Sequence, residues 1–211
     1  MASASAGVTI EELLALAIRH VNAGQPARAR ELCAHALATL PAHAGIHQLL
    51  AVLDQQQGDV DGARRHAAAS LALRPDHVPT LLVAADAAKA CGAVDDAMRA
   101  LERAVGLAPD HDEGWFRLAL LQQDARQLDA AARSLQHVLR LRPGRADAAV
   151  NLGIVLQEAG HVDAALVAFG RAYRLREDTF GRIAHALATP PAGRLWLDLE
   201  ELRRTLRALP G

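Results

Sequence analysis

The side chains best suited to metal chemistry are ten histidines, and three of them follow a regular spacing. His43, His77 and His111 lie 34 residues apart, each two residues after a proline. Imidazole is a common metal ligand, but equivalent positions on packed helices lie about 10 Å apart. These three side chains therefore cannot share one ion, and we interpret them as turn residues. His43 and His47 have a ligand-like spacing without an evident third ligand, so we predict no metal site and no cofactor.

The sequence also lacks the motifs of common catalytic sites. It has no Gly-rich phosphate loop, no G-x-S-x-G, no H-E-x-x-H and no calcium-binding loop. A second regular column is acidic and falls early in predicted helices, where a carboxylate stabilises the helix dipole without any catalytic role. Its members are Asp61, Asp95, Asp129 and Asp163. We predict that the chain has no catalytic residues and is not an enzyme.

Cysteine usage and charge exclude further classes of protein. Cys33 and Cys91 lie far apart without a C-x-x-C motif, which fits a reducing, cytoplasmic compartment. Both occupy small-residue positions, and we expect both to be buried. The 23 basic and 24 acidic residues give a net charge of −1, so no global field favours nucleic acid or anionic membrane. No apolar stretch is long enough to span a membrane, and the N-terminal residues do not resemble a secretory signal.

The composition indicates helices packed through small side chains. Hydrophobic residues make up 51% of the 211-residue chain, yet aromatic residues make up only 3%. Alanine accounts for 47 residues, and it is the best helix former. A β-sandwich or barrel would need more β-branched and aromatic residues. All six aromatic residues lie at or beyond Trp115, so we expect any binding hot spot in that half of the chain.

Three columns of residues recur with a period of 34. Prolines occur at positions 41, 75, 109 and 143, and glycines at positions 24, 58, 92 and 160, with Arg126 at the missing glycine position. An alanine follows five residues after each member of the glycine column. A glycine suits a left-handed helix C-cap, and a proline cannot continue a helix. Each period therefore predicts a helical hairpin, and a hairpin must stack on neighbours to bury its apolar face.

This 34-residue unit resembles the tetratricopeptide repeat. The fourth unit opens with Trp115, Leu118 and Ala119, which match the family's W-x-x-L-[GA] pattern. His47, Arg126 and Glu177 stand where the family prefers Trp or Leu, glycine and proline. The resemblance implies an all-α fold, a right-handed α-solenoid of stacked antiparallel helix hairpins. Its five repeats are placed at 10–43, 44–77, 78–111, 112–145 and 146–179.

The two ends are expected to close this array. Residues 1–9 are predicted to be a disordered N-terminus followed by a capping box that starts at Thr9. Residues 180–211 are predicted to form capping helices around a break at 189–193. The last helix carries a leucine stripe that would cover the open end of the array. The alternative is a homodimer contact through the same stripe. The residues assigned to this cap or dimer contact are Trp196, Leu199, Leu202 and Leu206.

In the tetratricopeptide repeat family the first helix of each repeat lines a concave groove, and the resemblance places particular columns there. The groove floor is then largely apolar, with a row of glutamines at its rim. The chaperone-binding carboxylate clamp is absent, and the asparagine column of extended-peptide binders holds only Asn151. The groove residues carried over are Leu14, Ile18, Gln48, Val52, Gln55, Leu82, Asp86, Lys89, Phe116, Leu120, Gln123, Val150, Asn151, Ile154 and Gln157.

An apolar floor with a glutamine rim favours an amphipathic or apolar helical segment as ligand. We predict a scaffold or adaptor that binds a protein or peptide partner in this groove. The alternative is an accessory or substrate-presenting domain of a bacterial glycosyltransferase, sulfotransferase or oxygenase, by analogy of fold only. The groove columns have a simpler interpretation as well, in which they face water or lie under the chain's own C-terminal helix.

Overall fold

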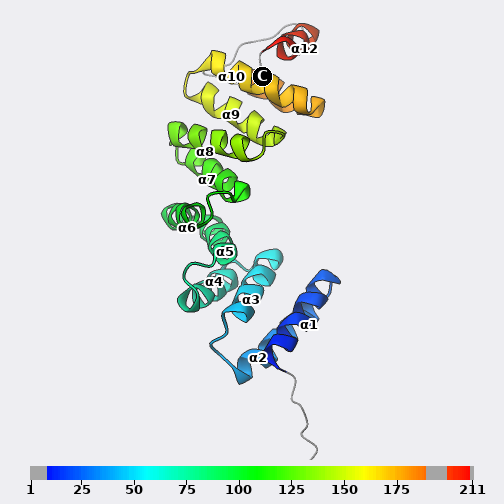
Figure 1. Cartoon of the computed structure of the whole chain (residues 1–211), viewed down its shortest axis with the longest axis vertical. Helices are drawn as coiled ribbons and strands as arrows, with labels where there is room; N and C mark the ends of the chain where they lie inside the picture. Colours follow the sequence, from blue (N-terminus) through cyan, green and yellow to red (C-terminus); the bar gives the residue numbers. More distant parts are fainter. Residues whose placement is uncertain (1–8, 189–198, 210–211) are drawn as a thin grey trace, which may run out of the picture. The chain divides into compact units, whose positions relative to one another are not determined.

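A computed structural model describes residues 9–188 and 199–209, and these residues are helical without any strand (Figure 1). The helices connect through short turns and pair consecutively in hairpins. The expected all-α fold of stacked helix hairpins is confirmed. The helices are α1 (Ile10–Asn22), α2 (Pro26–Thr39), α3 (Ala44–Gln57), α4 (Val60–Leu73), α5 (Val78–Ala90), α6 (Val94–Leu107), α7 (Asp112–Asp124), α8 (Leu128–Leu141), α9 (Ala146–Glu158), α10 (Val162–Leu175), α11 (Phe180–Ala188) and α12 (Leu199–Ala208).

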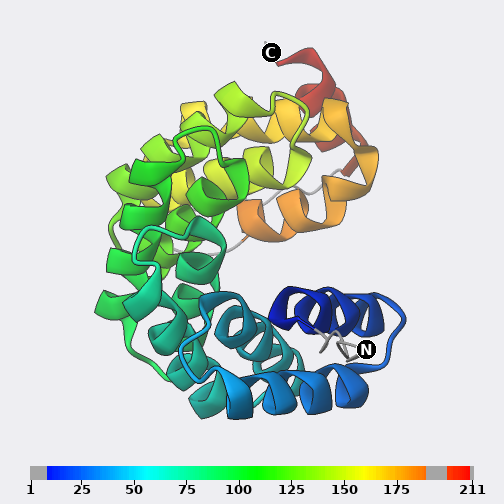
Figure 2. The same ribbon diagram turned by 60° about the horizontal axis from the view of Figure 1, so that its bottom comes forward.

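The chain forms two compact units that divide between Leu107 and Ala108. Unit 1 holds the hairpins α1/α2, α3/α4 and α5/α6, and unit 2 holds α7/α8 and α9/α10 followed by α11 and α12. Figure 2 shows the paired helices of each unit from a second side. The first helices of the five hairpins begin at residues 10, 44, 78, 112 and 146, the residues at which the 34-residue count starts each repeat.

Local capping explains where the helices begin and end. The Thr9 hydroxyl accepts a hydrogen bond from the Glu12 amide, and the Thr9 amide donates to the Glu12 carboxylate, so the predicted capping box is present. Between the helices of each hairpin the turn residue has positive φ. Four of these residues are glycines with φ between 70° and 84°, and the fifth is Arg126 with φ 60°. The glycine column therefore marks a backbone position that must be left-handed.

Small side chains allow the two helices of each hairpin to approach closely. At the predicted contact positions Ala17, Ala51, Ala85 and Ala119 are each at most 2% exposed, as are their partners on the second helices. In the fifth hairpin Gly153 faces the Phe169 ring, which is completely buried. The alanine excess of the sequence therefore serves packing between helices in contact.

The described part of the C-terminal region covers unit 2 in two places. Helix α12 packs on α10, with Leu202 and Leu206 fully buried (Figure 2). Arg174 of α10 donates to the main-chain oxygens of Leu206 and Leu209 at 3.2 and 2.5 Å. Helix α11 instead packs on α9. Residues 1–8, 189–198 and 210–211, which include Trp196, lie outside the described residues. None of the described helices is both long and apolar enough to cross a membrane.

Candidate binding groove

The predicted groove residues of α1 and α3 lie together in unit 1. Leu14 and Ile18 of α1 face Gln48 and Val52 of α3 across a cleft of about 570 Å³ that Leu49 also lines. Ile18 is 43% exposed, which is unusual for a large aliphatic side chain in a first helix of this chain. We call the cleft lined by these five residues the unit 1 groove. Its floor can remove apolar side chains of a ligand from water.

Polar groups stand at the ends of the unit 1 groove. Glu11 and Arg74 contribute an acid and a base to its lining, together with His43 and Gly45. His43 has a capping role there, because its Nδ1 accepts a hydrogen bond from the Ile46 amide at 3.2 Å. A Cβ atom at Gly45 would lie only 3.0 Å from Leu14 Cδ2. Glycine at this position therefore lets α3 approach α1 closely.

The predicted glutamine rim links neighbouring repeats inside each unit. Gln55 Nε2 of α3 donates to Asp86 Oδ2 of α5 at 2.9 Å in unit 1. Gln123 Nε2 of α7 donates to Glu158 Oε1 of α9 at 3.0 Å in unit 2. Leu82 is buried beside this rim, while Lys89 is exposed. These glutamines therefore hold adjacent first helices together at the edge of the predicted groove.

In unit 2 the side chain of Arg145 covers Phe116. Its guanidinium carbon lies 4.0 Å from the centroid of the Phe116 ring, within the range of a cation–π contact. Phe116 and Leu120, both predicted groove residues, are half-buried. The indole of the adjacent Trp115 donates to the Pro109 carbonyl and its ring lies against His137. The large rings near the start of α7 are thus already engaged within the chain.

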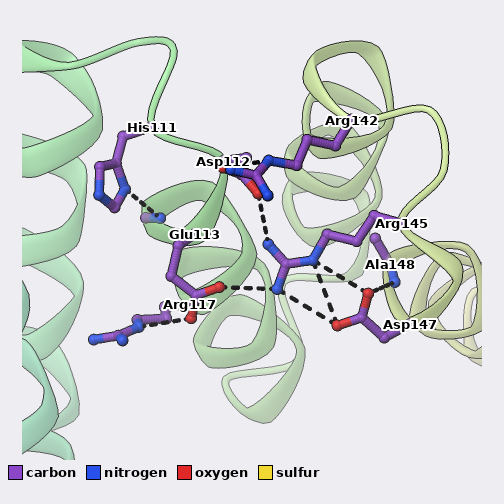
Figure 3. A network of polar contacts seen from close by, with 9 residues as sticks. His111, Asp112, Glu113, Arg117, Arg142, Arg145, Asp147 and Ala148 are labelled. Atoms are coloured by element: carbon purple, nitrogen blue, oxygen red, sulfur yellow. Dashed lines mark hydrogen bonds and ion pairs between the residues drawn. The ribbon is translucent and has the colours of Figure 1, made fainter.

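Arg145 is the centre of an ion-pair network between α7 and α9 (Figure 3). Its nitrogens lie 2.9 Å from Asp112 Oδ2, 2.9 Å from Glu113 Oε2 and 3.2 Å from Asp147 Oδ1. Burial lowers the pKa of the Arg145 guanidinium, but hydrogen bonds to Asp147 and Glu113 outweigh this effect and leave it raised. Arg142 adds a second contact to Asp112 at 3.0 Å. The network therefore fixes the amino-terminal turns of α7 and α9 and pairs each of these three acids.

The predicted groove residues of α9 lie largely beneath α11. Val150, Asn151 and Gln157 are 0%, 8% and 6% exposed, and Ile154 is half-buried. We call these four residues the α9 face. Arg182 of α11 donates to Asn151 Oδ1 at 3.0 Å, and Gln157 Nε2 donates to the Ala186 carbonyl of α11 at 2.7 Å. On this helix a segment of the same chain occupies the position predicted for a partner.

The leucine stripe of the last helix is divided between core and surface. Leu202 and Leu206 are buried on α10, whereas Leu199 is 51% exposed. Among the predicted cap or dimer residues, the two buried leucines therefore act in the cap. Trp196 lies outside the described residues.

The remaining chemistry candidates have structural roles in the described chain. His111 Nδ1 accepts from the Gly114 amide at 2.9 Å, and His77 Nδ1 contacts Thr80 Oγ1 at 2.8 Å. Among residues 9–188 and 199–209, no group of three His, Cys, Asp or Glu side chains is placed to hold a metal ion. Cys33 is buried as expected, but the expectation for Cys91 is wrong. Cys91 is exposed because it is the C-cap residue of α5.

Sequence reasoning missed the groups that close parts of the predicted groove. Arg145 occupies the position 34 residues after His111, so the break in the histidine column is the one signal that marks it. Arg182 has no such signal, because the repeat pattern ends before it. Glu11 and Arg74 were missed for another reason. They lie outside the carried-over columns and meet only when α1 and the turn after α4 are brought together.

Models of the tetratricopeptide repeat match most of this chain. One matches residues 20–69 and 55–123, and a second matches residues 116–181. A search of curated proteins found no match.

Solved structures of repeat proteins share the fold at low sequence identity. MamA from Desulfovibrio magneticus RS-1 has a TM-score of 0.75 at 18% identity, over 82% of this chain and 97% of that one. TTC0263, a thermophilic TPR protein of Thermus thermophilus, has a TM-score of 0.61 at 21% identity, over 86% of this chain and 100% of that one. YrrB, described as a TPR protein with an unusual peptide-binding site, has a TM-score of 0.73 at 18% identity, over 81% and 88% of the two chains.

Proposed function

The chain belongs to the tetratricopeptide repeat family, and from this premise we propose that it binds a helical segment of a partner protein in the unit 1 groove. The fold is that of a protein-interaction scaffold, and we propose that the chain acts without catalysis. The observation that carries the proposal is the open apolar cleft between α1 and α3, with Ile18 43% exposed in its wall. An exposed aliphatic side chain in a concave, apolar site is typical of a binding surface.

The shape and chemistry of the cleft favour an amphipathic helix as ligand. Two first helices form its sides, so a third helix can place aliphatic residues three or four positions apart between them. Glu11 and Arg74 in the lining offer opposite charges to the polar side of such a helix. The peptide-binding site described for YrrB supports peptide binding by this fold. Both described cysteines are free thiols, and we place this activity in the cytoplasm.

The proposal is tested by affinity capture with two matched variants. Ile18→Glu puts a charge into the groove, and Val94→Glu puts the same charge on α6 at a side chain of similar exposure, 38% against 43%. We expect Ile18→Glu to weaken partner binding by about tenfold or more, because an unpaired charge is buried at the interface. Val94→Glu should bind like the unmodified chain, and circular dichroism should show equal helicity for all three. Undiminished binding by Ile18→Glu contradicts the proposal.

A further inference from the structure

Helix α11 contacts the α9 face in the manner of a docked helical ligand. Ile183 and Leu187 lie four residues apart on α11 and are 0% and 2% exposed within the apolar cluster of unit 2. Arg182 supplies a side-chain hydrogen bond to Asn151, and the Ala186 carbonyl in the last turn accepts one from Gln157. Carbonyls of a last helical turn have no partner within their own helix. The α9 face therefore recognises both the aliphatic side chains and the carboxyl end of a helix.

The fit between α11 and the α9 face leaves one polar atom unsatisfied. Gln157 is 6% exposed, and within the described residues its Oε1 accepts no hydrogen bond. A buried acceptor without a donor destabilises the arrangement that buries it. Gln55 and Gln123, at the equivalent positions of other repeats, are not buried. A helix that offered a donor at this point would satisfy both ends of the Gln157 amide, which α11 does not.

Helix α11 is also the weakest of the helices that cover unit 2. It has nine residues where the first helices of the repeats have 13 or 14, and a helix this short is not stable without its contacts. Gly181 in its first turn lowers its helix propensity further. The neighbouring helix α10 is covered by α12, so α11 can leave α9 while α12 keeps its position. The cover of the α9 face is thus separable from the cap of the array.

We propose that the α9 face is a second helix-binding site, which α11 covers in the free protein. Its partner is a helix with two aliphatic side chains four residues apart and a hydrogen-bond donor facing Gln157 Oε1. The inference rests on the proposed function only in taking a helix as the ligand. Because α11 must leave before this partner binds, the apparent affinity falls with the fraction of molecules that are covered.

A labelled peptide that copies residues 177–188 tests the proposal by fluorescence anisotropy with the full chain. The double substitution Ile183→Ala with Leu187→Ala weakens the cover, and we expect it to bind the peptide about tenfold more tightly than the unmodified chain. Gly181→Ala should act in the opposite direction, because its Cβ meets no neighbouring atom and alanine stabilises the helix. A peptide carrying Ile183→Asp and Leu187→Asp should not bind.

Equal peptide affinity for all three chains overturns the proposal. Peptide binding that is lost in Ile18→Glu but unchanged by the α11 substitutions also overturns it, because the peptide is then held by the unit 1 groove. Hydrogen exchange of the unmodified chain supplies a test that needs no variant to fold. Amides of 180–188 should exchange faster than those of α9, and exchange of both at one rate contradicts the proposal. Failure here with Ile18-dependent partner capture intact leaves the proposed function standing.

Discussion

At the scale of single residues, the two thiols have opposite surroundings. Cys33 is 1% exposed in α2, and burial raises the pKa of its thiol to about 11, against a smaller lowering by Arg30. Cys91 is exposed, and its Sγ lies 3.1 Å from the Ala88 carbonyl. Because only a thiolate attacks a disulfide reagent, these surroundings set the reactivity of each residue.

We predict that one thiol of the native protein reacts rapidly with an aromatic disulfide at pH 8. The second should react only at the rate of unfolding, since Cys33 must become exposed and ionised first. Cys91→Ser should remove the rapid phase and leave the slow one. Two rapid phases in the native protein contradict the burial of Cys33, and denaturant should convert both thiols to the rapid class.

A pair of histidines in unit 1 makes stability sensitive to acid. His47 Nε2 lies 3.0 Å from the Pro41 carbonyl, which can only accept, so this nitrogen carries the proton of a neutral ring. His47 Nδ1 then accepts from His66 Nδ1 at 3.1 Å. Burial lowers the pKa of His66, against the raising effect of the buried Asp54 carboxylate 3.9 Å away. The neutral pair is therefore the form that folding favours.

We predict that the free energy of unfolding falls as pH is lowered through 6.5, the ordinary pKa of histidine. The unfolded chain then binds a proton that native His66 resists, which favours unfolding. Urea denaturation at a series of pH values measures this slope. His66→Gln should flatten it, whereas substitution of the exposed His161 by Gln should not. An equal slope for His66→Gln excludes this pair as the cause.

At the scale of the helical element, the turn inside each hairpin is the most constrained feature. Four turns use glycine at positive φ, and the turn between α7 and α8 uses Arg126 at φ 60°. A side chain in this region collides with its own backbone, which costs roughly 1–2 kcal/mol. Arg126 also pairs with Glu158 at 3.0 Å, but it is 69% exposed and such a surface pair contributes little.

We predict that Arg126→Gly raises the free energy of unfolding by about 0.5–1 kcal/mol, since relief of strain exceeds the lost ion pair. Arg126→Ala is the matched control, because it removes the ion pair and keeps the strained backbone. Thermal and urea denaturation should therefore rank Arg126→Gly above the unmodified chain and Arg126→Ala at or below it. A glycine variant that is less stable than the alanine variant contradicts the role of the backbone.

The close contact inside the fifth hairpin gives a second prediction for an element. A Cβ atom at Gly153 would collide with the Phe169 ring, which has no exposed surface. Gly153→Ala should destabilise unit 2 by about 1–3 kcal/mol, as overpacking of a filled core does. Phe169→Leu in the same chain should recover part of that loss in a double-mutant cycle. Simple additivity of the two substitutions would show that the ring moves aside.

The positions of the helices follow from signals that are local in the sequence. Thr9 with Glu12 and the left-handed turn residues are recognisable by residue type, and the period repeats each signal. Exposure at a helix end is harder to predict, as Cys91 shows, because the small-residue pattern does not say where α5 stops. The covering of Phe116 by Arg145 depends on two side chains 29 residues apart. No local pattern contains that information.

At the scale of the whole molecule, the sequence predicts which helices carry a binding surface but not how much of it is open. The columns on α1 and α3 come together as an apolar cleft. The same columns on α9 lie under α11, where the 34-residue pattern has ended and no longer constrains the chain. Openness depends on what the C-terminal segments cover, which is a property of tertiary packing. The unit 1 groove is therefore the docking surface that we propose to be free.

Site-specific photocrosslinking is the sharpest test of helix binding at this surface. A benzophenone amino acid at position 52 places the crosslinker in the unit 1 groove, and one at position 94 places it on α6 as the control. We predict that position 52 forms a covalent adduct with one partner protein, and that mass spectrometry maps the link to an amphipathic helical segment. Ile18→Glu should abolish that adduct. An adduct that forms equally at position 94, or that persists in Ile18→Glu, contradicts helix binding in the unit 1 groove.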